Sequence, residues 1–178
     1  MTVIHPNDPT TKFLSLLYET RDDISALITE ANTKSEVQRA IRGDDTIMML
    51  GHGSEFALFS DRRSASQFGR QLVNSDFVQF LRDKTCIGIW CHANKFAERY
   101  HLHGLFSGMI ISEEHEAVEC KIAATKEEIE EEILKFTIRL KDCIERYGLK
   151  ETPQRMKELD DVKSELTTFN YNNLYYFE

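Results

Sequence analysis

The sequence is short of positive charge. Its 178 residues include 22 Lys and Arg against 30 Asp and Glu, which gives a formal net charge of −8. An acidic chain repels polyphosphates at long range, so this balance argues against nucleic acid as a general partner. The chain also lacks any run near the roughly 20 apolar residues that a membrane-spanning helix needs, and its start lacks the pattern of a secretory signal. We therefore expect a cytoplasmic protein that does not bind membranes.

Cysteine is scarce, and no two cysteines have the C-x-x-C spacing; the four are Cys86, Cys91, Cys120 and Cys143. Without a secretory signal this pattern predicts reduced thiols and no disulfide framework. His101 and His103 form an isolated H-x-H, which falls short of a zinc-ligand set. The G-x-S-x-G motif of serine hydrolases is also missing. The sequence therefore predicts neither a metal nor a cofactor.

Internal repeats and low-complexity segments are absent too, and the length fits a single domain over residues 1–178. The hydrophobic content of 41% and the charged content of 29% are those of an ordinary globular protein. A chain of this length buries about 70% of its unfolded surface, which is enough for a substantial core.

Two continuous apolar runs, Thr46–Leu50 and Cys86–Cys91, predict strands that are buried on both faces, as in a parallel sheet. Shorter strands are expected at Thr2–His5, Ser25–Thr29 and Leu105–Ile111, with a small hairpin arm at Phe56–Ser60. Helical spacing or caps between the strands predict helices from Thr10 or Thr11 to Leu17, from Ser35 to Arg42, from Phe68 to Leu81 and from Lys95 to Leu102. This alternation predicts an α/β fold, a three-layer sandwich around a mostly parallel sheet.

From about residue 113 the chain has helical periodicity. Thr125 and Glu128 form a capping box. The buried face of the helix that follows is expected to carry Ile129, Ile133, Phe136 and Leu140. A further helix is expected to begin at Thr152-Pro153, and the aromatic tail 171–177 is expected to pack on the body. We therefore expect 113–178 to be a helical C-terminal extension of the same domain.

Reactive side chains follow the two buried strands. His52, within Gly51-His52-Gly53, follows the third expected strand, and Cys91 ends the fourth. Sites of open parallel sheets form beyond the carboxyl ends of the strands, so neighbouring strands would bring these side chains together. An imidazole can accept the proton of a thiol, which makes Cys91 a candidate nucleophile and His52 a candidate base. The backbone N–H groups of Gly53 and Cys91 are candidate donors to an oxyanion.

An apolar strand ending in Leu50-Gly51-His52-Gly53, followed by one ending in Ile89-Trp90-Cys91, resembles the caspase-like superfamily of cysteine peptidases, which includes caspases, metacaspases, clostripain-like and gingipain-like enzymes. The resemblance covers roughly residues 2–111. It implies a caspase-type sheet, a His52–Cys91 dyad and cleavage of a peptide bond after a defined side chain. The 39 residues between the two are fewer than the roughly 50 of caspases, and the Q-A-C-x-G signature is absent.

The charged residues expected near the site predict which substrate side chain is preferred before the scissile bond. In the superfamily the loop after the first strand helps to line the pocket for this residue, and here it holds Asp8; Glu113 and Glu114 follow the fifth strand. An acidic pocket of this kind would favour Arg or Lys in the substrate. Arg62 and Arg63, on a nearby loop, would oppose that preference.

The sequence leaves three functions open. The favoured one is a cysteine endopeptidase in which His52 is the base and Cys91 attacks a protein or peptide substrate. Taken singly, Cys91 also fits a small buried hydrophobe and His52 an ordinary turn residue. The alternative is therefore a catalytically inactive caspase-like fold that serves as a protein-interaction module. A third option is a hydrolase or transferase that uses the same dyad on a small acyl substrate.

Overall fold

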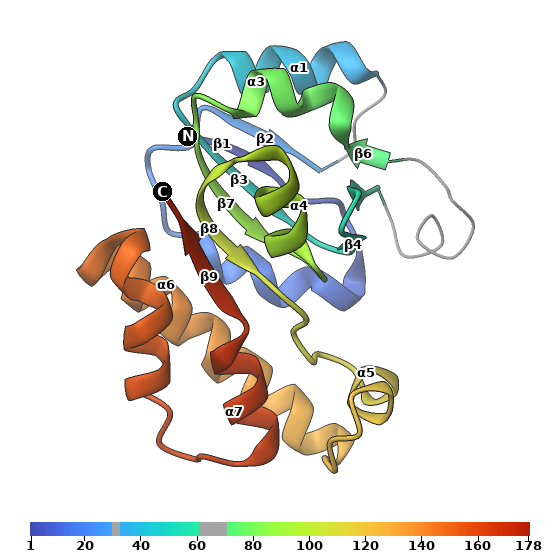
Figure 1. Cartoon of the computed structure of the whole chain (residues 1–178), viewed down its shortest axis with the longest axis vertical. Coiled ribbons are helices and arrows are strands. Elements are labelled where there is room, and N and C mark those ends of the chain that lie inside the picture. Colours follow the sequence, from blue (N-terminus) through green and yellow to red (C-terminus); the bar gives the residue numbers. More distant parts are fainter. Residues whose placement is uncertain (30–32, 61–70) are drawn as a thin grey trace.

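A computed structural model describes residues 1–29, 33–60 and 71–178. In these residues a six-stranded sheet has the order β2-β1-β3-β7-β8-β9, and only β9 runs antiparallel to its neighbour (Figure 1). The strands are β1 (Thr2–Ile4), β2 (Ala26–Ile28), β3 (Thr46–Leu50), β7 (Thr85–Ile89), β8 (His103–Ser107) and β9 (Leu174–Phe177). The prediction of an α/β fold with a mostly parallel sheet is confirmed.

Helices cover both faces of the sheet because alternate strand residues point to opposite sides. In β3, Ile47 and Met49 join a core with α1 (Lys34–Arg42), α3 (Val78–Leu81) and α4 (Ala93–Tyr100). Met48 and Leu50 join a second core on the other face. That core includes the 3₁₀ helix η1 (Pro9–Leu17), α6 (Lys126–Glu158) and α7 (Glu165–Asn172). Among the described helices, none is both long and apolar enough to cross a bilayer.

The segment expected to be one helix from Phe68 to Leu81 differs from the prediction. Gln71–Val73 is a strand, β6, in a three-stranded antiparallel sheet with β4 (Gly53–Ser54) and β5 (Ala57–Phe59). Leu72 and Val73 are buried there, so their apolar character reflects sheet packing. Asn74 then caps a short 3₁₀ turn, η2 (Ser75–Phe77), that leads into α3. Residues 61–70 of the prediction lie outside the described residues.

Two helix starts and one strand also differ from the predicted bounds. Asp8, rather than Thr10 or Thr11, caps η1, because its carboxylate accepts from the Thr10 N–H at 2.9 Å. Thr33 caps α1, two residues ahead of the expected start at Ser35. The strand expected at Leu105–Ile111 begins and ends earlier, as β8. Gly104 lies so close to β7 there that a Cβ would stand 1.9 Å from the Cys86 carbonyl oxygen.

The C-terminal third is helical apart from its last residues. α5 (Glu114–Glu119) precedes α6, which begins with the predicted Thr125 and Glu128 capping box. The regular helix is interrupted at Gly148 (φ 75°, ψ 171°), so a new helix begins there, earlier than Thr152-Pro153. The tail packs on the body as expected, and it does so as β9, which adds an edge strand to the main sheet.

Candidate functional site

The chain beyond β3 and the chain beyond β7 leave the sheet together. Leu50 pairs with Ile89 as the last residues of the two parallel strands, and the Gly51 N–H donates to the Ile89 carbonyl at 3.1 Å. Gly51 has a φ of +138°, a left-handed conformation that side chains disfavour, and it turns the chain out of the sheet. His52 and Cys91 therefore emerge at the same carboxyl edge, from neighbouring strands.

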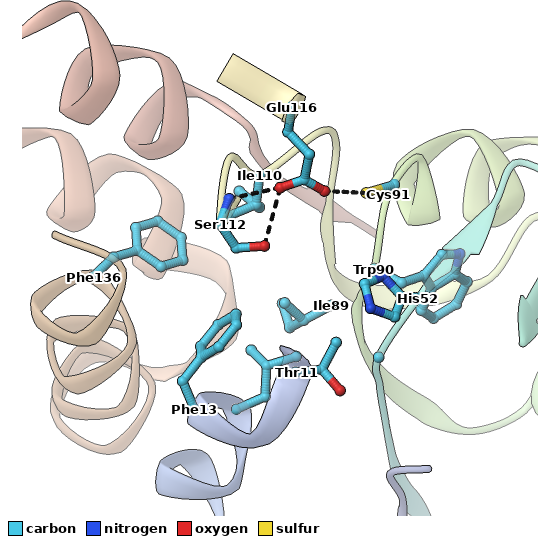
Figure 2. Close-up of a pocket in the computed structure, with 12 residues that line it drawn as sticks. Thr11, Phe13, His52, Ile89, Trp90, Cys91, Ile110, Ser112, Glu116 and Phe136 are labelled. Atoms are coloured by element: carbon cyan, nitrogen blue, oxygen red, sulfur yellow. Dashed lines mark hydrogen bonds between the residues drawn. The ribbon is translucent and has the colours of Figure 1, made fainter. Parts of the chain in front are cut away.

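Both side chains line one cavity of about 30 Å³, drawn in Figure 2. A cavity holds a water molecule once it offers roughly 10–15 Å³, so this one has space for only about two or three waters. Residues from η1, from the β3 and β7 ends, from the start of α5 and from α6 line it: Thr11, Phe13, Leu14, Gly51, His52, Ile89, Trp90, Cys91, Ile110, Ser112, Glu116 and Phe136. The structure thus brings the predicted pair together in a narrow and largely apolar space.

Cys91 is a half-buried thiol that faces a carboxylate. Its Sγ contacts Oε1 of Glu116 at 4.0 Å (Figure 2). Burial, followed by the negative charge of Glu116, raises the pKa of the Cys91 thiol to about 12. In this arrangement the thiol stays protonated at neutral pH, so its reaction requires a base or a change in its surroundings.

Glu116 is a site residue that the sequence analysis missed. Its side chain is buried, with 5% of the residue exposed. Oε2 accepts hydrogen bonds from the N–H and the hydroxyl of Ser112, at 2.7 and 3.0 Å, and from the Glu113 N–H at 3.0 Å. The only signal in the sequence was the Glu113 to Glu116 spacing of a helix capping box, which by itself indicates a helix start.

His52 is held by the first helical segment. Its Nε2 lies 2.6 Å from Oγ1 of Thr10, and the Thr10 hydroxyl donates to Oδ1 of Asp8 at 2.7 Å. Because the one Thr10 hydroxyl proton goes to Asp8, Oγ1 must accept from Nε2–H of His52. Nδ1 of the neutral imidazole is then left with its lone pair, as a base requires.

Gly53 packs tightly at the start of β4. A Cβ there would lie 2.2 Å from Cδ1 of Trp90 and 2.5 Å from the Ala57 carbonyl oxygen. The Phe59 N–H donates to the His52 carbonyl at 2.9 Å. The next pair along this antiparallel ladder, Gly53 with Leu58, is therefore one that is not hydrogen-bonded, so the Gly53 N–H points away from β5. In the described part of the chain, the Cys91 N–H donates to no backbone carbonyl, and both it and the Ile110 N–H interact with the Cys91 sulfur.

The predicted acidic residues do not form one pocket. Asp8 is engaged with Thr10 as the cap of η1. Glu114 is exposed on α5. Glu113 lines a groove of about 450 Å³ between η1, the start of α5 and α6, together with Pro9, Thr10, Phe13, Ser112, Glu130, Ile133 and Leu134. This groove shares Phe13 and Ser112 with the cavity, so the two adjoin. Arg62 and Arg63 lie outside the described residues.

One group of potential metal ligands is present among the described residues. Glu113, His115 and Glu116 place one ligand atom each within 4.8 Å of one another. His115 is exposed, and Glu116 already accepts three hydrogen bonds, so helix capping accounts for this arrangement. His103 packs edge-on against Tyr176, with ring centroids 5.6 Å apart, and is not near the site's carboxylates.

The site therefore joins a thiol, an oriented imidazole and a buried carboxylate that come from three separate parts of the chain. Trp90, the residue after β7, is fixed by its backbone N–H, which donates to Oγ of Ser107 at 3.0 Å, and by an edge contact of its ring with Phe96 of α4. A scan against protein-family models finds no match to this chain, and a search of curated protein sequences also finds none.

Proposed function

We propose that the protein is a cysteine endopeptidase of the caspase-like type that uses a His52–Cys91 dyad. The observation that carries this proposal is the placement of His52 and Cys91 beyond paired residues of adjacent parallel strands, where both line one cavity. Nucleophile, base and a third group that orients the base are the parts such chemistry needs. Thr10 and Asp8 supply the third part.

In the proposed reaction, His52 accepts the thiol proton at Nδ1 as Cys91 Sγ bonds to the carbonyl carbon of the scissile peptide. Nε2–H keeps its hydrogen bond to Thr10, whose link to the Asp8 carboxylate stabilises the resulting imidazolium. The protonated His52 then gives its proton to the leaving amine as the C–N bond breaks. A water molecule, deprotonated by His52, hydrolyses the thioester and returns Cys91 as a thiol.

The negative charge on the carbonyl oxygen of the tetrahedral intermediate needs fixed donors. The Gly53 N–H, directed away from β5, and the Cys91 N–H are the candidates. Because backbone donors on strand ends are rigid, they cost little reorganisation during the reaction. The contact of Gly53 with the Trp90 ring fixes the position of the first donor.

The groove beside the cavity supports a preference for a basic residue before the scissile bond. Its walls combine the carboxylates of Glu113 and Glu130 with apolar side chains such as Phe13 and Ile133. A Lys or Arg side chain has the matching character, an apolar stem with a cationic end. Glu113 is thus the one predicted specificity residue that lines this groove, and Glu130 joins it.

A peptide library that varies the residue before the scissile bond tests the proposal. We expect cleavage after Arg and Lys, and we expect Cys91→Ala and His52→Ala each to abolish it while the circular dichroism spectrum stays unchanged. His101→Asn is a control away from the dyad, since His101 is exposed at the end of α4, and it should retain cleavage. Full activity of either dyad variant would exclude the mechanism.

A second function, an inactive fold that serves as an interaction module, is favoured by one specific observation. Burial and the charge of Glu116 raise the pKa of the Cys91 thiol to about 12, in a cavity of only about 30 Å³. An inactive module predicts no Cys91-dependent cleavage of any library member by the wild-type chain or by Glu116→Gln. Cleavage that Cys91→Ala removes would exclude it.

A further inference from the structure

The carboxylate of Glu116 lies beside the Cys91 sulfur, which must be unobstructed to attack a substrate. Figure 2 shows it reaching from the start of α5 toward Cys91, across the cavity from His52 and Phe13. A fixed negative charge beside the sulfur disfavours formation of a thiolate. The same charge would also repel an oxyanion forming on a substrate carbonyl at Cys91. The described arrangement is therefore a resting one.

The hydrogen bonds that hold Glu116 are local to its own segment. All three donors, two from Ser112 and one from Glu113, lie within four residues of it in the chain. If residues 112–119 move as a unit, these bonds persist. The contacts that break are the one to Cys91, which at 4.0 Å is long and weak, and the packing of Ala117 against Ile129 and Leu166.

The segment also has defined points of attachment. Before it, Ile111 is fixed to α7, because Asn170 accepts from the Ile111 N–H at 2.8 Å and donates to its carbonyl at 3.0 Å. After it, Thr125 caps α6. Between these points, Ala117 packs in a small core cluster with Ile111, Ile129 and Leu166. Figure 1 shows α5 as a short helix beyond the end of β8.

We propose that Glu116 is an autoinhibitory latch, which covers the Cys91 sulfur in the resting protein and must withdraw with residues 112–119 before Cys91 can attack a substrate. The inference rests on the proposed function for its biological meaning, while the contact it describes does not. The groove lined by Ser112 and Glu113 adjoins the latch, so a peptide that enters the groove meets the segment that has to move.

The rate at which iodoacetamide alkylates Cys91, followed by mass spectrometry of its peptide at pH 8, tests the latch without any peptidase assay. Glu116→Gln keeps the size of the side chain and its capping acceptor but removes the charge, so we expect alkylation about tenfold faster than in the wild type, as for a fall of one unit in the thiol pKa. Glu119→Gln, the matched control, removes an exposed charge from the same helix and should change the rate less than twofold. An unchanged or slower rate in Glu116→Gln overturns the latch.

Ser112→Ala offers a second test that keeps the Glu116 charge. It removes one of the three hydrogen bonds to Oε2, and we expect a smaller rise in the Cys91 rate, about threefold, because the carboxylate is held less firmly. Cys86 and Cys143, both buried, serve as internal controls for folding, since a fast rate at these thiols marks general unfolding. A Ser112→Ala rate equal to that of the wild type counts against the latch.

The two proposals fail in different ways. Faster alkylation of Cys91 in Glu116→Gln, without cleavage of any peptide by either protein, keeps the latch and removes the peptidase. Cleavage that depends on Cys91, with an alkylation rate that Glu116→Gln leaves unchanged, keeps the peptidase and removes the latch.

Discussion

Nε2 of His52 lies 2.6 Å from the hydroxyl oxygen of Thr10, 42 residues earlier in the chain. This bond connects the first turn of η1 to the residue beyond Gly51, so the imidazole is oriented only when η1 is packed on the sheet. The Thr10 hydroxyl donates to Asp8, so it can only accept from His52, and the contact with Nε2 therefore decides which ring nitrogen carries the proton. Thr10 is therefore a positioning residue for the proposed base.

Thr10→Val should release His52 while keeping the shape of the side chain. We expect the rate of peptide cleavage to fall about tenfold or more, because a base without a fixed tautomer is less often ready to accept a proton. Long-range ¹⁵N–¹H NMR spectra should show the Nε2–H form of His52 in the wild type and a mixture of tautomers in Thr10→Val. Thr10→Ser, which keeps the hydroxyl, should restore both properties. A wild-type spectrum dominated by the Nδ1–H form would contradict the assignment.

Trp90→Phe should weaken the support of Gly53. The Trp90 Nε1–H donates to the Ser54 carbonyl at 3.0 Å, and its ring lies against Gly53. Loss of the hydrogen bond and of part of the ring should lower the free energy of unfolding by about 1–2 kcal/mol, measured in urea. Cleavage should fall as well, because a proposed oxyanion donor loses its support. Phe96→Leu, which removes ring contacts with Trp90 and Tyr100 but leaves the Trp90 ring against Gly53, should lower stability and spare cleavage. Equal loss of activity in both variants would contradict this role.

The central sheet and the His52–Cys91 pairing were predictable because both follow from local patterns. Thr46–Leu50 and the apolar run that ends at Cys91 contain no alternation, a pattern typical of a strand covered on both faces. Once two such strands are neighbours and parallel, the residues beyond their carboxyl ends must meet. Their actual register, Leu50 opposite Ile89, agrees with that expectation.

The rest of the site depends on contacts between distant segments. Glu116 is 25 residues from Cys91 and belongs to a helix whose direction is set by the packing of Ile111 and Ala117. The prediction of a helix through residues 71–73 was wrong for a related reason. Apolar spacing in a short run does not separate a helix from a strand, and here pairing with β5 decides the outcome. The edge strand at 174–177 likewise gains its structure from β8.

At the amino end of the sheet, Asp44 makes stability depend on acid pH. Its carboxylate accepts hydrogen bonds from the hydroxyls of Ser25 and Thr2, which lower its pKa from 3.8 to about 2. Because the folded pKa is below the unfolded one, this stabilisation is complete above about pH 4 and is lost as pH falls toward 2. It should amount to about 1 kcal/mol after solvent screening.

Urea unfolding at pH 7 and at pH 2.5 tests this. Asp44→Asn should be less stable than the wild type at pH 7, and the difference should shrink at pH 2.5. Asp45→Asn is the control, since that side chain is exposed and its ion pair with Lys84 is a surface one. A difference between Asp44→Asn and the wild type that is the same at both pH values would contradict the assigned cause.

Replacement of Asn170 should weaken the attachment of residues 112–119 at Ile111, where the segment that carries Glu116 begins. It is 2% exposed, and it satisfies both the N–H and the carbonyl of Ile111, the last fixed residue before the segment that carries Glu116. Asn170→Ala leaves two buried backbone groups without a partner, so we expect a loss of about 2–4 kcal/mol in the free energy of unfolding. Ile111 should then hold residues 112–119 less firmly, and Cys91 should be alkylated several times faster.

Two comparisons separate this local effect from unfolding. Asn172→Ala changes the same residue type on the same helix, but Asn172 is exposed and bonds only within α7, so both stability and the Cys91 rate should stay near the wild-type values. Within Asn170→Ala itself, Cys86 is buried in the opposite core and should remain unreactive while Cys91 reacts. If Cys86 and Cys91 accelerate together, the variant opens as a whole and Ile111 is not the base of the latch. Acceleration confined to Cys91 shows that the short stretch between Ile111 and Thr125 opens by itself, as withdrawal of Glu116 requires.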